Sequence, residues 1–284
     1  KDAFLHYLDL GSQVQSLIKF MKHTQSGSQA EALLNNFEIE PDIHKAGKVN
    51  QILNPNMNII VQIAKEPISS KGPRITSEVS FAGRYVVLVP FSDVVSVSQK
   101  IKSSAERLRL KRLATSIKPR NFGIIVRTVA EGKKVADLDR DVQDLASKWM
   151  SLHEQLKTST PPSKLLGEID RASTILRDLL SPNFNAIHVN DVRVAEEIKS
   201  YIRGIAPDQV DIVKMYKGKM PIFEHFGIDK QIKSLFGKTV NMAGGSYLII
   251  EHTEAMHVID VNSGGRNKGS GDSQESNAFQ TNLM

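Results

Sequence analysis

An acidic residue stands inside a strongly apolar segment near the end of the chain. Residues 247–262 predict an antiparallel hairpin with a short polar turn. Because side chains alternate along a strand, Asp260 and Asn262 share one face of this hairpin. A carboxylate in apolar surroundings is costly unless a cation or a donor compensates it. The pair therefore predicts a hard-cation site with Asp260 as a ligand, and Mg²⁺ fits because it needs only one or two carboxylates.

A metal ion at Asp260 would polarise a phosphodiester and generate a water nucleophile. The segment Ser263–Asp272 that follows is rich in glycine and carries Arg266 and Lys268, so it suits contact with a phosphate backbone. The alternative is an aspartate that caps the end of the hairpin, followed by a linker. The residues alone leave both interpretations open.

A second candidate site lies where Arg127 and Thr128 follow the apolar segment Gly123–Val126. This segment predicts a short buried strand, which places a guanidinium and a hydroxyl side by side at the strand end. Such a pair can hold a terminal phosphate through charge-assisted hydrogen bonds. The alternative is an arginine that simply leaves the core for solvent.

Basic residues are concentrated around this second site. Residues 100–134 contain eleven Lys and Arg against Glu106 and Glu131, a local charge of +9. The whole chain has 37 basic and 31 acidic residues, so its net charge is +6 and the remainder carries −3. A local block of this sign is typical of a polyanion-binding surface, and the alternative is a solvated helix face.

The elements that must position these residues begin with a β-rich region over residues 1–99. Strands are expected at Met57–Lys65, Ile75–Phe81 and Tyr85–Val89, with a basic turn between the first two. Short strands with basic loops favour a small barrel of the OB type. Residues 22–50 are polar and predict a long insertion around a short helix near Ala30–Asn36.

The clearest periodicity of the chain follows a basic helix expected over residues 103–117. Apolar residues alternate at spacings of three and four along one helix that ends before Pro161, and Asp141 falls on the polar face of that helix. Packing on the protein's own core and a coiled-coil dimer both explain the pattern. The apolar positions are Val135, Leu138, Val142, Leu145, Trp149, Leu152 and Leu156.

Beyond Pro162 the predicted helices and strands alternate, which favours an α/β layer domain. The expected helices are Ser163–Leu180, Asp191–Gly204 and Ile228–Phe236, and the expected strands between them are Ala186–Val189 and Val210–Met215.

The composition excludes several classes of protein. The chain has 284 residues and no cysteine, which excludes disulfide frameworks, thiolate zinc sites and cysteine nucleophiles. There is no long apolar run and no phosphate-binding P-loop, so neither a membrane span nor a P-loop ATPase is expected. No close pair of histidine ligands occurs, so the eight histidines are expected to have structural or surface roles. With no signal-peptide pattern, a cytoplasmic location is expected. The first residue is Lys1 rather than Met, and we expect an internal fragment of a longer protein.

Two of these motifs resemble a known family. Residues 259–264, with residues 252–256 before them, resemble the catalytic segment of the ribonuclease E/G endoribonucleases. Residues 123–128, followed by residues 131–133, resemble the 5′-sensor segment of the same family.

The resemblance extends over essentially the whole chain. Met215–Phe223 resembles the start of the family's linker, and Val61–Val89 resembles its OB-fold RNA-binding domain. Lys71–Arg74 is most similar to the ribonuclease G side of the family, in a Bacteroidetes-like form. The implied fold is α+β and multidomain, with a truncated OB-fold domain at 1–78, a 5′-sensor subdomain at 79–162, an RNase H-like subdomain at 163–236 and the start of a DNase I-like catalytic subdomain at 237–284.

The resemblance also implies roles for individual residues. Asp260 would be a Mg²⁺ ligand, and Asn262 would orient the scissile phosphate or the attacking water. Arg127 and Thr128 would bind the 5′-monophosphate of the RNA, with the backbone near Val87 completing the pocket. The implied activity is hydrolysis of single-stranded RNA in rRNA maturation and mRNA turnover.

RNA-binding residues implied by the resemblance lie elsewhere in the chain: Phe4 as a stacking aromatic, with Lys71, Arg74 and Lys100. The family's second metal-binding aspartate and the zinc link between its subunits are expected beyond Met284, so cleavage by this chain alone is expected to be poor or absent. The full-length protein is expected to be a homo-oligomer. Two rival interpretations are a non-catalytic RNA-binding scaffold and a protein-interaction module built on the heptad helix.

Overall fold

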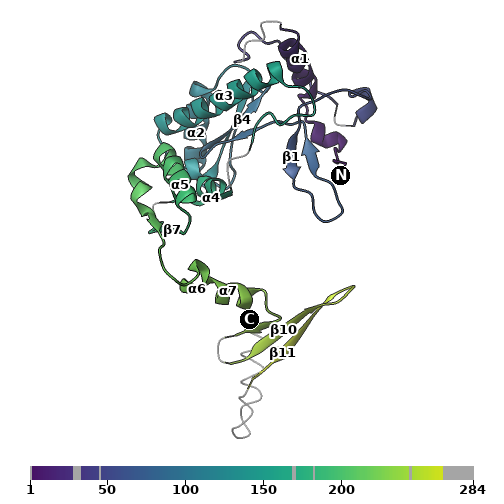
Figure 1. Cartoon of the computed structure of the whole chain (residues 1–284). Helices are drawn as coiled ribbons and strands as arrows, with labels where there is room; N and C mark the ends of the chain where they lie inside the picture. Colours follow the sequence, from purple (N-terminus) through teal and green to yellow (C-terminus); the bar gives the residue numbers. More distant parts are fainter. Residues whose placement is uncertain are drawn as a thin grey trace. The chain divides into compact units, whose positions relative to one another are not determined.

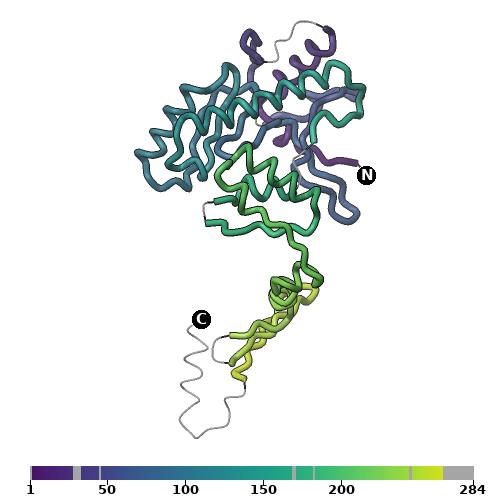
Figure 2. Tube along the Cα trace, turned by 60° about the vertical axis from the view of Figure 1, so that its left-hand side comes forward, coloured from purple at the N-terminus to yellow at the C-terminus, as the bar shows by residue number. Residues whose placement is uncertain are grey.

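The computed structural model describes residues 2–27, 33–44, 46–167, 171–181, 183–242 and 245–264. The chain divides into two compact units, which Figures 1 and 2 draw as ribbon and trace. The first unit comprises residues 1–184 and 201–207, and the second comprises residues 185–200 and 208–284. Within the described residues, each unit contains two sheets, so each has hydrogen-bonded strands of its own.

The larger sheet of the first unit has four strands in the order β3-β4-β6-β5. Strand β6 runs antiparallel to β4 and parallel to β5, so it lies inside the sheet. Its apolar residues are mostly buried, as expected for a central strand. The strands are β3 (Phe81–Ala82), β4 (Val86–Pro90), β5 (Val95–Val97) and β6 (Phe122–Val126).

Helix α2 (Ser104–Ile117) connects β5 to β6 and confirms the expected basic helix. It begins at Ser103, whose hydroxyl accepts a hydrogen bond from the Glu106 N–H at 3.3 Å. A serine in this position satisfies one of the free N–H groups of the first turn. The helix ends before Pro119, which cannot continue it.

The heptad pattern forms one helix, α3 (Val135–Thr158), and this helix packs on the protein's own core. Every apolar position of the pattern from Leu138 to Leu156 is buried in the first unit's core. Trp149 is fully buried, with the rings of Phe20, Phe81, Phe91 and Phe122 centred 4.9 to 6.0 Å from it. Since the seam is already covered, the coiled-coil and interaction-module interpretations are wrong for this helix.

The amino-terminal part of the first unit is less regular. Helix α1 (Val14–Gln25) packs against α3, and Figure 2 shows the two traces crossing at the top of the unit. Strands β1 (Gln62–Lys65) and β2 (Arg74–Thr76) form a separate antiparallel pair. The short helix η1 (Tyr7–Leu10) contacts β2, and the short helix η2 (Val49–Gln51) precedes β1 in the chain. The described strands form no closed barrel.

Several expected elements in this region are shorter than their sequence patterns. Met57–Ile60 precede β1 without forming a strand, and Ser77–Ser80 separate β2 from β3. The expected helix near Ala30–Asn36 lies partly outside the described residues, and Leu33–Asn36 form turns. Here apolar runs contribute loop residues to the core, so pattern alone overestimates regular structure.

The alternating pattern after Pro162 is largely confirmed. Helix α4 (Arg171–Leu179) belongs to the first unit and is shorter than expected, because residues 163–167 are not helical. Strands β7 (Ile187–Val189) and β8 (Val213–Met215) pair in parallel in the second unit. Helix α5 (Val192–Ile205) connects them, and the 3₁₀ helix η4 (Pro207–Ile212) replaces the expected start of β8.

The rest of the second unit carries the predicted hairpin. Helices α6 (Ile222–His225) and α7 (Ile228–Leu235) precede the antiparallel sheet β11-β10-β9. Strands β10 (Tyr247–His252) and β11 (His257–Asn262) match the prediction, whereas β9 (Thr239–Asn241) was not expected. Among the described residues, no helix has the length and apolar character needed to cross a membrane.

Candidate functional site

The predicted hairpin places Asp260 and Asn262 together. They lie on the same face of β11, opposite Ile249 and Tyr247 of β10. The Nδ2 group of Asn262 donates a hydrogen bond to Oδ2 of Asp260 at 3.0 Å. Asp260 itself is exposed, and so are Val258, Ile259 and Val261 around it. The expectation of an acid in buried, apolar surroundings is therefore wrong, because the described residues provide no layer that covers this strand.

The donor set at this position is small. An exposed carboxylate with an amide beside it suits Mg²⁺, which keeps several waters and takes few protein ligands. No group of three or more potential metal-ligating side chains occurs within the described part of the chain. The metal assignment of Asp260 stays a prediction from the sequence. Of the loop Ser263–Asp272, residues 265–272 lie outside the described residues.

The two histidines of the hairpin pair across its tip, on the face opposite Asp260. His252 and His257 are register partners, and their Nδ1 atoms contact each other. This contact lies where the chain turns, and both side chains are exposed.

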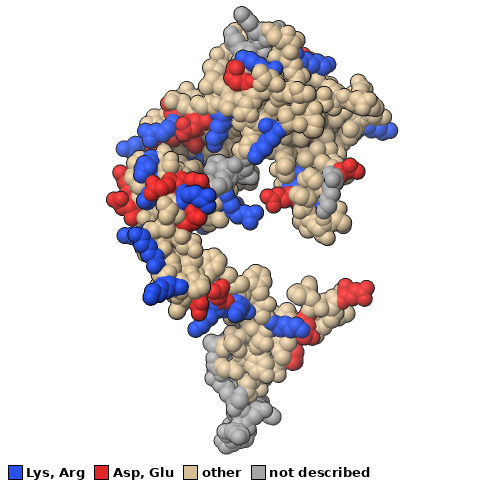
Figure 3. All heavy atoms as spheres, viewed as in Figure 1, with Lys and Arg blue, Asp and Glu red and all other residues tan. Residues whose placement is uncertain are grey.

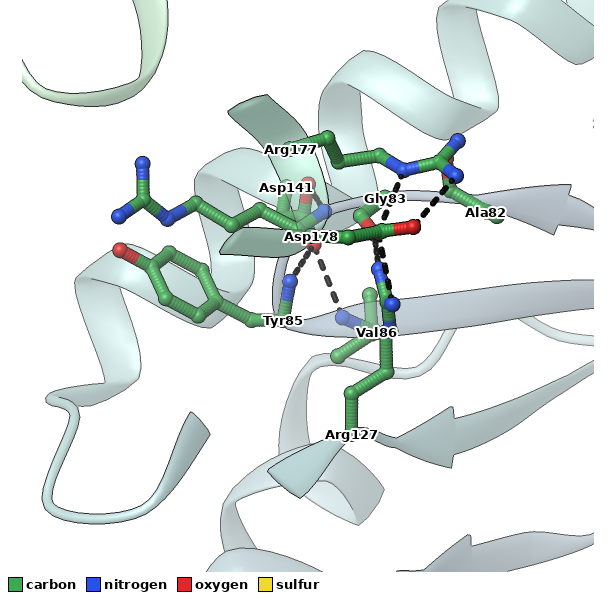
Figure 4. Close-up of polar contacts among 9 residues, drawn as sticks. Ala82, Gly83, Tyr85, Val86, Arg127, Asp141, Arg177 and Asp178 are labelled. Atoms are coloured by element: carbon green, nitrogen blue, oxygen red, sulfur yellow. Dashed lines mark hydrogen bonds and ion pairs between the residues drawn. The ribbon is translucent and has the colours of Figure 1, made fainter. Parts of the chain in front are cut away.

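Arg127 lies at the carboxyl end of β6, where the sheet meets η3 (Thr128–Ala130). Its backbone N–H donates to the Tyr85 carbonyl at 2.8 Å, and Nη1 of its side chain donates to the Gly83 carbonyl at 2.7 Å. Nη2 forms an ion pair with Oδ1 of Asp178 at 2.7 Å. Figure 4 shows this guanidinium pointing toward Asp178 and Gly83, so the interpretation of an arginine that merely enters solvent is wrong.

Asp178 belongs to α4 and is held by a second arginine. Arg177 approaches it through Nε at 3.0 Å from Oδ1 and through Nη2 at 3.3 Å from Oδ2. The hydrogen bond from Arg177, together with Arg127, lowers the pKa of Asp178 below its usual value. Sequence reasoning did not find this residue. The adjacent Arg177-Asp178 pair was the available signal, but only folding brings it to Arg127.

Asp141 fixes the chain segment that holds Arg127. Its carboxylate accepts hydrogen bonds from the backbone N–H groups of Arg84, Tyr85 and Val86 at 2.7 to 3.1 Å, two of which Figure 4 draws. Burial raises the pKa of Asp141, although the three N–H groups favour its charged form. A Cβ on Gly83 would collide with this carboxylate. The placement of Asp141 on a solvent-facing side of the helix was therefore wrong.

Thr128 and Val87 occupy different positions around Arg127. The Thr128 hydroxyl is exposed and lies 3.0 Å from the Ser98 hydroxyl. Val87 lies in the middle of β4, paired with Ala82 on one side and Ile125 on the other. Arg127 and Thr128 are thus adjacent at the strand end.

The other predicted RNA-binding residues lie in two places. Phe4 bridges to Arg74, and its ring side chain is 59% exposed. Arg74 binds Asp9 through two hydrogen bonds of 2.8 Å, which lower the pKa of Asp9. Lys71 is exposed in the turn before β2, and Lys100 is exposed just before α2. The structure therefore groups Phe4, Lys71 and Arg74 but places Lys100 beside the other sheet of the first unit.

Ion pairs neutralise part of the basic segment 100–134. Glu106 binds Arg109 through two hydrogen bonds of 2.7 Å, which lower the pKa of Glu106 to about 2. Lys118 pairs with Asp93 at 2.8 Å. Figure 3 shows Lys and Arg interspersed with Asp and Glu on the face it views. The exposed cations of the segment are Lys100, Lys102, Lys111, Arg112, Arg120 and Lys134.

Comparison with known proteins agrees with these motifs. Residues 80–284 match the model of the ribonuclease E/G family. The chain is 36% identical over 222 residues to a ribonuclease E of Nostoc, which covers 77% of this chain and 32% of that protein. It is 33% identical over 264 residues to a ribonuclease G of Haemophilus influenzae and 30% identical to that of Escherichia coli, covering 93% of this chain and 50% of each relative. The chain thus spans between a third and a half of these relatives.

Proposed function

The chain belongs to the ribonuclease E/G family, and from that membership we propose that the whole protein is a Mg²⁺-dependent endoribonuclease acting on single-stranded RNA. Its substrates would be rRNA precursors and mRNAs, in RNA processing and decay. The observation that carries this proposal is the hydrogen-bonded pair of Asp260 and Asn262 on an exposed strand face. A carboxylate left open to solvent is available to bind a cation.

The proposed reaction is hydrolysis of a phosphodiester. Bound Mg²⁺ would neutralise the phosphate and activate water. Asp260 would hold the ion, and the Nδ2 donor of Asn262 at 3.0 Å keeps that carboxylate in one orientation. Water attacks phosphorus, the 3′ oxygen of the upstream product leaves, and the downstream product keeps a 5′-phosphate.

The first unit would recognise the 5′ end of the RNA. Arg127 is held in place at its backbone and at Nη1, and Thr128 offers an exposed hydroxyl next to it. A guanidinium fixed in this way binds a phosphate with little further loss of side-chain entropy. The exposed cations of segment 100–134 would add sequence-independent affinity that falls with salt.

The same proposal includes four further properties of the whole protein, which only the family resemblance supports. They are the identities of the subdomains, the homo-oligomeric state, the cytoplasmic location and the zinc link between subunits. An RNA-binding scaffold that lacks catalysis is the remaining alternative, and it predicts no dependence on Mg²⁺.

The test is Asp260→Asn in the whole protein. We expect the cleavage rate of a single-stranded RNA to fall by at least about a hundredfold, because the ion loses its charged ligand. RNA affinity should stay within about threefold, since binding depends mainly on cations elsewhere. Single-turnover cleavage and fluorescence anisotropy measure the two quantities.

Asp229→Asn is the matched control, because Asp229 is an exposed acid of α7 in the same unit and lies outside the hairpin. It removes one negative charge and should leave cleavage unchanged. Full activity in Asp260→Asn would remove the catalytic assignment. RNA binding by the whole protein without any Mg²⁺-dependent cleavage would favour the scaffold alternative.

A further inference from the structure

The Nη2 group of Arg127, which would donate to a bound phosphate, is already paired with the carboxylate of Asp178. We infer that Asp178 is an internal competitor, which occupies Arg127 until a 5′-phosphate displaces it and so determines how strongly the site selects for that phosphate. This inference rests on the proposed 5′-phosphate recognition by Arg127 and deepens it.

The contacts of Arg127 make Nη2 the group at which an anion binds. Nη1 is fixed on the Gly83 carbonyl at 2.7 Å, so the guanidinium cannot turn freely. Nη2 points at Oδ1 of Asp178 at the same distance. A phosphate oxygen is an acceptor of the same kind as a carboxylate oxygen. A phosphate at this nitrogen therefore replaces the carboxylate or lies directly beside it.

Two neighbouring anions repel each other. A terminal phosphate carries a charge between −1.5 and −2 near neutral pH. At a separation of about 6 Å in a solvated site, an additional carboxylate weakens its binding by roughly fivefold to tenfold. Asp178 is about one-third exposed and Arg127 about one-quarter, so solvent and ligand reach both groups.

Arg177 keeps the Asp178 carboxylate paired when a phosphate replaces it on Arg127. It binds both oxygens of Asp178, at 3.0 and 3.3 Å, and its own side chain is only 12% exposed. When a phosphate takes Nη2 of Arg127, the carboxylate keeps its pair with Arg177. The exchange replaces the Arg127–Asp178 ion pair with an Arg127–phosphate ion pair. The preference for a 5′-monophosphate over a 5′-hydroxyl therefore depends on the charge of Asp178.

Asp178→Asn tests the charge alone, because asparagine keeps the size and the acceptor oxygen. The measurement is the affinity of the chain for two RNA oligonucleotides of one sequence, with a 5′-monophosphate or a 5′-hydroxyl, by fluorescence anisotropy. We expect the monophosphate affinity to rise about fivefold and the hydroxyl affinity to change less than about twofold. An unchanged or smaller ratio of the two affinities would overturn the inference.

Arg177→Gln gives a result of the opposite sign. It leaves Asp178 with Arg127 as its only arginine partner, so the monophosphate affinity should fall while the hydroxyl affinity stays unchanged. A purely structural role for the cluster would make both variants weaken binding. Opposite signs therefore separate competition from loss of folding, which a thermal melt of each variant checks.

Asp93→Asn is the matched control. Asp93 also pairs with a basic residue, Lys118, at 2.8 Å, and its replacement also removes one negative charge from the first unit. It should raise both RNA affinities equally and leave their ratio unchanged, because Asp93 lies beyond the Pro90 end of β4, whereas Arg127 follows the residue that pairs with the Val86 end.

Arg127→Ala distinguishes failure of the inference about Asp178 from failure of the proposed 5′-phosphate recognition. If it abolishes the monophosphate preference while Asp178→Asn leaves the ratio unchanged, the inference fails and the proposed recognition stands. If wild type, Arg127→Ala and Asp178→Asn all bind the two RNAs equally, both the recognition and the inference fail.

Discussion

The two candidate sites differ in how much of their geometry the described residues provide. Arg127 is surrounded by a backbone carbonyl, a carboxylate and a strand of the main sheet, and each contact lies within one compact unit. Asp260 has one side-chain partner, Asn262, on a strand that is exposed almost throughout. The candidate phosphate-binding site is therefore assembled by a core, whereas the candidate catalytic residue lies on an open sheet.

The difference has a physical origin. In the first unit, a fully buried tryptophan and four phenylalanines fill the space between helices and sheet, so strand ends and their side chains are fixed. In the second unit, the apolar residues of β11 are exposed and those of β10 are only partly buried, so the hydrogen bond from Asn262 is the main constraint on Asp260. The Arg127 site is therefore fixed by a surrounding core, whereas the Asp260 site is fixed by one exposed hydrogen bond and would be completed by its ligand.

The largest expected effect compares the two regions directly. Trp149→Ala should lower the free energy of unfolding of the first unit by about 3–5 kcal/mol, because a buried ring is lost and a cavity remains. Ile259→Ala in β11, where the side chain is 57% exposed, should cost less than about 1 kcal/mol. Urea unfolding followed by far-ultraviolet circular dichroism measures both. Equal losses would contradict the contrast between the units.

An intermediate effect is expected at Asp141. Asp141→Asn replaces one acceptor oxygen with an N–H₂ group that faces backbone donors, so it should cost about 2 kcal/mol of stability. It should also reduce the 5′-monophosphate preference, since Gly83 and the guanidinium of Arg127 lose their fixed support. Thermal melts and the affinity ratio measure the two effects. A destabilised variant with the wild-type ratio would show that this support is unnecessary for recognition.

The smallest expected effect concerns pH. Arg177 and Arg127 lower the pKa of Asp178, so this carboxylate stays ionised from mildly acidic to neutral pH. Burial raises the pKa of nearby Tyr201 to about 12, so it stays neutral, and the arginines stay charged. The phosphate gains its second charge near about pH 6. The monophosphate preference should therefore rise about twofold to threefold between about pH 5 and about pH 7.5.

Asp178→Asn is the control for this pH profile. It should keep the rise with pH, because the titrating group is on the RNA, and its midpoint should lie at or below that of wild type, because the neighbouring carboxylate no longer opposes the second phosphate charge. Loss of the pH dependence in Asp178→Asn would assign the titration to the protein, which would contradict the constant charge expected for Asp178.

The fold was predictable where a pattern was long. The heptad positions predicted one long helix, which α3 confirms with 24 residues, and the apolar strands with a polar turn predicted the β10–β11 hairpin. Short elements were less predictable: β9 was missed, and the apolar run before β1 forms no strand. A three-residue strand such as β9 contains too few residues for an alternating pattern to be recognised in the sequence, even though its partner β10 follows closely.

The sequence by itself determined which chemical groups stand next to one another along the chain: Asp260 with Asn262, and Arg127 with Thr128. A strand's alternation and a strand's end are local properties, so spacing suffices to predict them. Only the tertiary structure decided that Asp178, fifty-one positions beyond Arg127 by residue number, pairs with it, and that Asp141 turns toward backbone N–H groups instead of solvent. Those contacts depend on how helices pack on the sheet, and packing is a property of the whole core.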